Sequence, residues 1–242
     1  MTFGPAPAPS VFATLLVSTK TGSWGRLGQT TLRSLAAEDP KASITDGTAS
    51  VETKQSLPTF TARYTGKSGP IAFSTAALVQ QVGYDTGTKD DAALGFAVFG
   101  SAKFNVTDTF SVQGNVNYTD GANGYLWRSG TNYYGEDAYV DANGDVETIT
   151  GYSANLGTSI KAGPGAFNAV YGFTTMDWDD AVDDGLAVGG KHETNTNAFV
   201  NYQWSPVKSV NLGVQYGYFQ VEKVNGDDGD ASRVMFAAQY NF

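Results

Sequence analysis

The sequence predicts an all-β fold, a transmembrane antiparallel β-barrel, and three observations predict it. Apolar and polar residues alternate with a period of two over segments of roughly 9 to 14 residues, long enough for a tilted strand to cross a bilayer. The connections between these segments alternate between short and long. The polar positions carry Ser, Thr, Asn and Gln far more often than charged residues.

Segment 109–119 shows the alternation most clearly. Phe110, Val112, Val116 and Tyr118 share one parity, and the other parity is entirely polar and uncharged. Because successive side chains on a strand point to opposite faces, one face is apolar and the other is polar. An uncharged polar face fits a water-filled lumen better than the charged exterior of a soluble sheet. The pattern recurs in segments 59–65, 94–105, 152–161, 167–173, 198–204, 210–218 and 233–242.

The connections favour the plan of an outer-membrane barrel, which has short turns at one end and long loops at the other. Short connections are expected at 20–23, 67–69, 106–108, 163–165 and 206–208, and long ones at 35–56, 84–90, 120–148, 177–193 and 224–230. The long connections are also acidic, with Asp177, Asp179, Asp180, Asp183 and Asp184 in one and Asp227, Asp228 and Asp230 in another.

Aromatic residues at strand ends are expected at the membrane–water interfaces. They are Tyr84, Tyr118, Trp178, Trp204, Tyr240 and Phe242. The terminal Phe242 is also expected to help the assembly machinery recognise the chain.

About 11 strands can be counted, the first near residues 11–19, whereas a closed bacterial barrel has an even number. The whole chain, 1–242, is therefore interpreted as one barrel domain that is incomplete at its N-terminal side.

Composition excludes several classes of site and partner. The chain has no Cys, which excludes a disulfide framework and a thiol nucleophile. Its net charge of −9 argues against a nucleic-acid partner. The sequence contains no run of about 18 apolar residues, so it does not predict a transmembrane helix. The mean hydropathy of −0.24 does not argue against a barrel, because lipid-facing and lumen-facing residues average out.

No catalytic or metal site is predicted. His192 is the only histidine, and it has no nucleophile motif beside it, so it is interpreted as a surface residue. The protein is therefore not expected to be an enzyme. Residues 141–147 begin like a calcium loop, but Val146 and Tyr152 occupy the positions that require Gly and Glu. A hairpin turn at Asn143-Gly144 is the favoured reading, and no metal or cofactor is expected.

Four cations fall on polar strand faces: Arg63, Lys103, Lys161 and Arg233. Because acids concentrate in the connections instead, these four residues are candidates for lining a pore and selecting anions. The acidic loops oppose this preference at the mouth. A weaker alternative is a hydrophobic path along the inward Phe99, Phe199 and Phe219, each of which is isolated among Asn, Gln and Gly in the sequence.

Five segments in order carry a family resemblance: "GPAPAPSVFATLLVS", "LPTFTARYTGKSGPIAFSTAALVQQVGYD", "DDAALGFAVFGSAKFNV", "VNYQWSPVKSVNLGVQYGYFQ" and "DGDASRVMFAAQYNF". Together they resemble the DcaP-like porins of Gram-negative outer membranes. The resemblance implies the C-terminal portion of a 16-stranded, trimeric porin that passes small, often anionic, dicarboxylate-like solutes. It also implies that residues 1–10 end a loop that folds inward and narrows the pore.

The function expected from these observations is passive diffusion of small hydrophilic solutes through an outer-membrane channel. The expected partners are the lipid bilayer, lipopolysaccharide, the solutes and other copies in a homotrimer. The alternative is a secreted soluble β-rich adhesin or glycan-binding protein.

Overall fold

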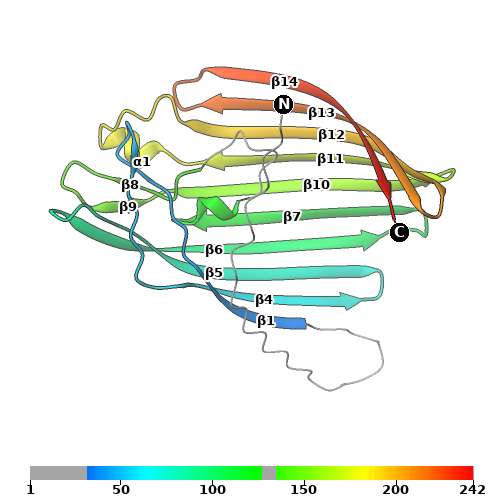
Figure 1. The fold of residues 1–242 in the computed structure, drawn as a ribbon, viewed down its shortest axis with the longest axis horizontal. Coiled ribbons are helices and arrows are strands. Elements are labelled where there is room, and N and C mark those ends of the chain that lie inside the picture. Colours follow the sequence, from blue (N-terminus) through cyan, green and yellow to red (C-terminus); the bar gives the residue numbers. More distant parts are fainter. Residues whose placement is uncertain (1–31, 127–134, 242) are drawn as a thin grey trace.

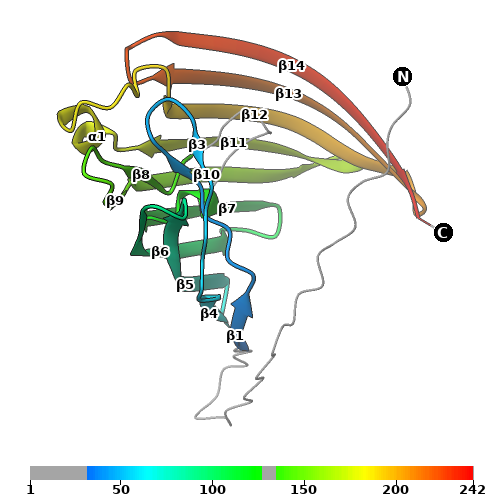
Figure 2. The ribbon, with the colours of Figure 1, turned by 60° about the vertical axis from the view of Figure 1, so that its left-hand side comes forward.

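The molecule is dominated by one antiparallel sheet of ten strands, which is strongly curved (Figures 1 and 2). The structure is a computed structural model, and it describes residues 32–126 and 135–241. The strands, in sheet order, are β1 (Leu32–Glu38), β4 (Thr59–Ser68), β5 (Ile71–Asp85), β6 (Asp90–Asn105), β7 (Phe110–Asp120), β10 (Thr150–Ala162), β11 (Gly165–Met176), β12 (His192–Val207), β13 (Val210–Lys223) and β14 (Asp228–Tyr240).

The all-β antiparallel fold is thereby confirmed. Within the described ranges the sheet is open, and β1 and β14 form its two edges. The strand expected near residues 11–19 lies outside the described residues, as do residues 1–10 and Phe242. No helix of the described segments has the length and apolar character needed to span a membrane.

The strand register gives the sheet two chemically different faces. In β10, Asn155 pairs with Asn115, whereas the next residue, Leu156, pairs with Gly114 and Tyr171. We call the face that carries Asn155 the concave face and the face that carries Leu156 the convex face. Apolar side chains stay exposed on the convex face: the exposed fraction is 82% for Phe236 and 59% for Leu156. A soluble sheet would bury such a face, so this one is suited to lipid.

Within the described residues, the short connections form tight turns, as the sequence predicts, whereas the connection expected at 20–23 lies outside them. Gly69 and Gly163 have positive φ angles of 55° and 58°, a conformation that favours glycine. Three expected long connections are shorter than predicted. The β5–β6 pairing continues to the Asp85–Asp90 pair, so only residues 86–89 remain as a turn, closed by the Thr86 N–H donating to the Lys89 carbonyl at 2.9 Å.

Strand pairing shortens the other two connections in the same way. The β13–β14 pairing continues to Glu222 and Asp228, so Asp228 and Asp230 lie in a strand and not in an acidic loop. The first strand continues to Glu38, which pairs with Thr59, so the connection that was expected to begin at Leu35 begins after Glu38.

The long connections after β1, β7 and β11 pack together as a cap at one end of the sheet, on the left in Figure 1. Its elements are a small four-stranded sheet in the order β3 (Ser50–Val51), β2 (Ile44–Thr45), β8 (Ala138–Val140), β9 (Val146–Thr148), a short helix α1 (Asp179–Asp183) and a 3-10 turn η1 (Asn123–Tyr125). The predicted hairpin at 141–147 is confirmed as β8–β9, with the Asp141 carboxylate accepting N–H donors from Asn143, Gly144 and Asp145.

The cap corrects the expectation for two of the interface aromatics. Tyr84 and Trp178 are only 5% and 3% exposed, and each lies in a buried apolar cluster of the cap. The alternation of residues along a strand does not show whether a distant loop covers the end of that strand. Tyr118 and Tyr240 do lie exposed on the convex face, as an interfacial position requires.

Candidate functional site

The concave face is a continuous polar wall built by the inward parity of the strands. The Asn168 side-chain amide donates to the side-chain Oδ1 of Asn201 at 2.8 Å, and the Asn117 side-chain amide donates to the Ser153 hydroxyl at 2.8 Å. Gln215 pairs with Asn201 in the next strand. These contacts cross from strand to strand, so the side-chain amides form a hydrogen-bonded lining. The predicted placement of the amides on one face, opposite Val112, Leu156, Leu212 and Phe236, is confirmed.

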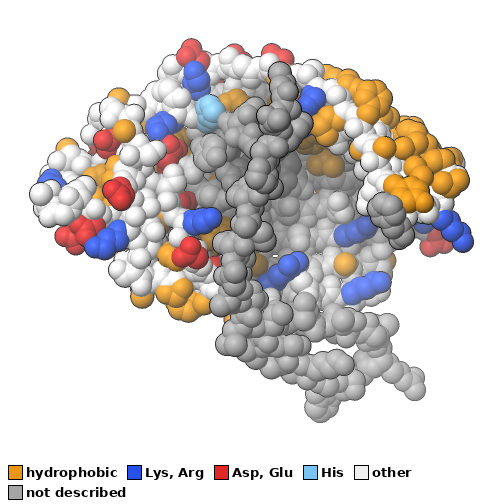
Figure 3. Space-filling model, viewed as in Figure 1, with side chains coloured by type: hydrophobic (Ala, Val, Ile, Leu, Met, Phe, Trp, Pro, Cys, Tyr) orange, Lys and Arg blue, Asp and Glu red, His pale blue; other side chains and the backbone are white. Residues whose placement is uncertain are grey.

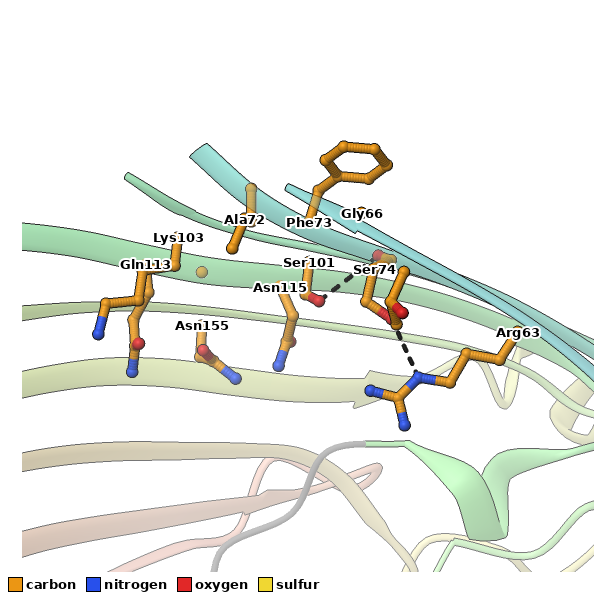
Figure 4. A pocket seen from close by; sticks show the side chains of 13 residues that line it. Arg63, Gly66, Ala72, Phe73, Ser74, Ser101, Lys103, Gln113, Asn115 and Asn155 are labelled. Carbon is orange, nitrogen blue, oxygen red and sulfur yellow. Dashed lines mark hydrogen bonds between the residues drawn. The ribbon is translucent and has the colours of Figure 1, made fainter. Parts of the chain in front are cut away.

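A hollow of about 410 Å³ opens on this wall, across β4 to β7 and β10 (Figure 4). Arg63 projects into it from β4, and its Nε donates to the Ser74 hydroxyl at 3.1 Å. This bond fixes the base of the guanidinium, which points away from the sheet in Figure 4. The lining is polar apart from a few small or aromatic residues and comprises Arg63, Thr65, Gly66, Ala72, Phe73, Ser74, Ser101, Ala102, Lys103, Gln113, Gly114, Asn115 and Asn155.

Lys103 connects this hollow with a second one of about 370 Å³, nearer to the short turns. Lys161 lines the second hollow together with Ser111 and Ser159. Asp108 also lines it, so this end of the wall is not purely cationic. The structure therefore brings Arg63, Lys103 and Lys161 to neighbouring parts of one surface.

Arg233 stands apart from the other three, near the opposite edge of the sheet. It pairs with Gly217 in β13, and its guanidinium carbon lies 5.1 Å from the centroid of the Phe219 ring. Such a cation–π contact orients the guanidinium without neutralising it. The rings of Phe199 and Phe219 are 5.4 Å apart and T-shaped, so these two residues, each isolated in the sequence, are in contact in the structure. They meet because Gly217 leaves room between them: a Cβ there would lie 3.0 Å from Phe199.

The charge on the concave face is mainly positive. Among the described residues the ion pairs are Lys54–Asp85, Lys191–Glu136 and Lys223–Asp227, and none involves the four candidate cations. In the view of Figure 3, several Lys and Arg side chains lie in the hollowed part and others lie toward the cap, which also holds most of the Asp and Glu side chains.

Further charged residues of the concave face were not singled out from the sequence, among them Lys67 and Glu38. Lys67 pairs with Ala72 and shares the parity of Arg63, which could have identified it. Glu38 lies on the same face at the cap end, where its carboxylate accepts from the Thr61 hydroxyl at 3.3 Å. Glu38 was expected in a loop, so strand parity could not predict which face of the sheet its side chain lies on.

His192 lies at the start of a strand rather than in a loop. His192 begins β12 and is half-buried, with its carbonyl accepting from the Trp178 indole at 3.1 Å, so it is not a loop residue as predicted. In the part of the chain that the structure describes, no three His, Asp or Glu side chains converge into a group that could hold a metal ion.

A segment that the sequence analysis did not identify lies on the concave face. Residues 121–126, which follow β7, fold back over β5 and β6, and Ala122 packs against Leu78 and Ala97. A buried carboxylate, Asp137, holds this segment to the cap: it accepts the Gly124 N–H at 3.0 Å and the Ser43 N–H at 2.8 Å. Burial raises the pKa of Asp137 to about 6, although these two N–H donors act in the opposite direction.

We expect the cap to open more readily as the pH rises from about 4 to 6. Opening would expose Asp137 and return its pKa to near 4, so the closed form binds the proton more strongly. The extra stability is therefore full below about pH 4 and is lost above about pH 6. Amide hydrogen-exchange protection of Ser43 and Gly124, corrected for intrinsic rates, should fall by about 100-fold over this range.

The Asp137→Asn variant is the control, because its side chain does not titrate. Its protection at these two amides should not change over the same pH range. A wild-type profile as flat as that of the variant would show that Asp137 does not couple to opening.

Comparison with known proteins supports an outer-membrane barrel. No family model matches the sequence, and no curated protein matches it. The crystal structure of the outer membrane channel DcaP of Acinetobacter baumannii is similar, with a TM-score of 0.73 and 26% identity over 90% of this chain and 60% of that one. The NanC porin matches with a TM-score of 0.39 and 7% identity over 88% of this chain and 94% of that one, too low for an argument.

The DcaP match confirms the resemblance drawn from the sequence. This chain spans 60% of the length of DcaP and has the strand arrangement of a DcaP-like barrel wall. Its exposed convex face and polar concave face are those of a barrel in the outer membrane.

Proposed function

We propose that this chain forms part of the wall of a water-filled outer-membrane channel. Small hydrophilic solutes diffuse through this channel, with a preference for anions. The observation that carries the proposal is the excess of cations on the concave face. Arg63, Lys103, Lys161 and Arg233 lie there outside any ion pair of the described residues, and the acids lie mostly in the cap. Low-dielectric walls focus the field of such charges on passing ions.

The chemistry of the hollow favours carboxylates among anions. The bond from Arg63 Nε to Ser74 leaves the outer nitrogens of the guanidinium as donors, and these can grip a carboxylate in a bidentate pair. Lys103 lines the same hollow as a second cation. A small dicarboxylate would thus meet two positive groups on one wall, and its passage requires no reaction and no cofactor.

The proposal includes a homotrimer in a Gram-negative outer membrane, with lipopolysaccharide and phospholipid around its outer surface. The family resemblance supports this assembly, and the exposed apolar side chains of the convex face supply the area that lipid or neighbouring protomers would cover. The same face argues against a secreted adhesin or glycan-binding protein, because a soluble protein rarely exposes so large an apolar surface.

A reversal-potential measurement tests the function. Protein extracted from outer membranes is inserted into a planar bilayer that separates dilute from more concentrated KCl. The reversal potential should have the sign of anion selectivity, and the selectivity should shrink at about 1 M salt, where the screening length is about 3 Å. The absence of channels, or a cation-selective potential at low salt, would contradict the proposal.

A further inference from the structure

We infer that residues 121–126 form an internal constriction of this channel and that Tyr125 limits its width. The inference rests on the proposed function, since a constriction matters only if solutes pass along the concave face. It assigns a size filter to a segment whose sequence carries no recognised motif.

The position of the segment is fixed by what it touches. Ala122 belongs to a buried cluster with Leu78 of β5 and Ala97 of β6, and Phe99 and Tyr125 pack against this cluster. Leu78 and Ala97 pair with each other on the concave face. The segment therefore lies on the lumen side of the wall and not at its rim.

The backbone of the segment rests directly on the wall. A Cβ at Gly95 of β6 would lie 2.1 Å from the Gly121 carbonyl oxygen, and a Cβ at Gly121 would lie 2.9 Å from the Gly95 Cα. Gly121 also has a φ of 65°. Two glycines thus permit a backbone contact that any larger residue would prevent. A connection that merely passed nearby would not need such closeness.

Side-chain hydrogen bonds from the wall hold the segment in place. The Gln80 amide donates to the Gly121 carbonyl at 2.8 Å, in a buried setting. The Thr119 hydroxyl donates to the side-chain Oδ1 of Asn123 at 2.5 Å, and the side-chain Nδ2 of Asn123 donates to the backbone carbonyl of Ile149 at 2.7 Å. Buried bonds of this kind are lost only at the cost of leaving their groups unpaired. The segment is consequently a fixed part of the lumen wall.

Burial along the concave face marks the level of the narrowing. Thr59, Gln80 and Thr119 are buried on β4, β5 and β7, at the level where the segment lies. Nearer the short turns, Arg63, Ser101 and Gln113 are exposed on the same face. Tyr125 lies at the boundary: it is half-buried and close to Thr59, so its segment reaches from β7 across to β4. A solute must pass its ring to reach the hollow beside Arg63.

The test compares two tyrosine substitutions in planar bilayers, with single-channel conductance and the size cut-off for polyethylene glycols as readouts. Tyr125→Ala should raise the conductance by about 1.5-fold and admit larger polymers, since conduction depends on pore diameter. Tyr152→Ala is the matched control, because Tyr152 lies on the convex face of β10. Its conductance and cut-off should equal those of the wild type.

The outcomes separate this inference from the proposed function. If wild-type channels are anion-selective and Tyr125→Ala leaves both readouts unchanged, the constriction is refuted while the function stands. If wild-type protein forms no channel, the function itself fails. Should Tyr125→Ala not fold, Tyr125→Trp decides: a lower conductance supports the constriction, and an unchanged one overturns it.

Discussion

Leu156→Arg is expected to lower the free energy of unfolding of the membrane-inserted barrel by about 2–4 kcal/mol. Leu156 lies near the middle of β10, on the convex face, and 59% of it is exposed. Gly114 and Tyr171 flank it in the neighbouring strands, and neither offers an acid to pair with a cation. A guanidinium there must enter the hydrocarbon or distort the bilayer around it. Denaturant titration of the protein folded into lipid vesicles measures the loss.

Asn155→Arg is the matched control, one residue earlier in the same strand. Asn155 faces the hollow on the concave side, so the new cation stays in water. The free energy of unfolding should change by less than about 1 kcal/mol. Equal losses for the two variants would contradict the assignment of the two faces, because only the side of the sheet distinguishes them.

The faces were predictable because the information is local. The alternation of polar and apolar residues within each strand indicates which side chains share a face. Successive pairs such as Asn155 and Leu156 give the same assignment along the whole strand. Tight turns were predictable for the same reason: Gly163 with Pro164 identifies a turn without reference to any distant residue. The sides of Arg63, Lys103, Lys161 and Arg233 followed directly from the parity of their strands.

What the sequence did not reveal depends on contacts between distant segments. The contact between Phe199 and Phe219 requires the register of β12 on β13, and the place of Arg233 over Phe219 requires that of β13 on β14. Tyr84 has the pattern of a strand end, but the cap buries it. The contact of residues 121–126 with Gly95 depends on how a connection returns to the wall, which no periodicity encodes.

The pair Arg63→Ala and Arg233→Ala, made together, should reduce the permeability of the channel to anions relative to cations. Each guanidinium group carries a positive charge. Arg63 is held by Ser74 and Arg233 by the Phe219 ring, and neither contact cancels the charge. Removing both should shift the reversal potential toward zero in dilute salt. The shift should be smaller at about 1 M salt, because the charges are screened there. Anion permeability relative to cations should fall by roughly 2- to 10-fold, which corresponds to about 0.4–1.4 kcal/mol.

Lys208→Ala is the control for a general change in net charge. Lys208 is exposed in the turn between β12 and β13, away from the hollows, so its loss should leave the selectivity near that of the wild type. The double variant should fold normally, since Arg63 and Arg233 are both exposed to water. If the reversal potential of the double variant matches that of the wild type, the field in the lumen comes from other charges. Lys103 and Lys161 would then be the next pair to remove, because they line the two hollows from β6 and β10, the strands on either side of β7.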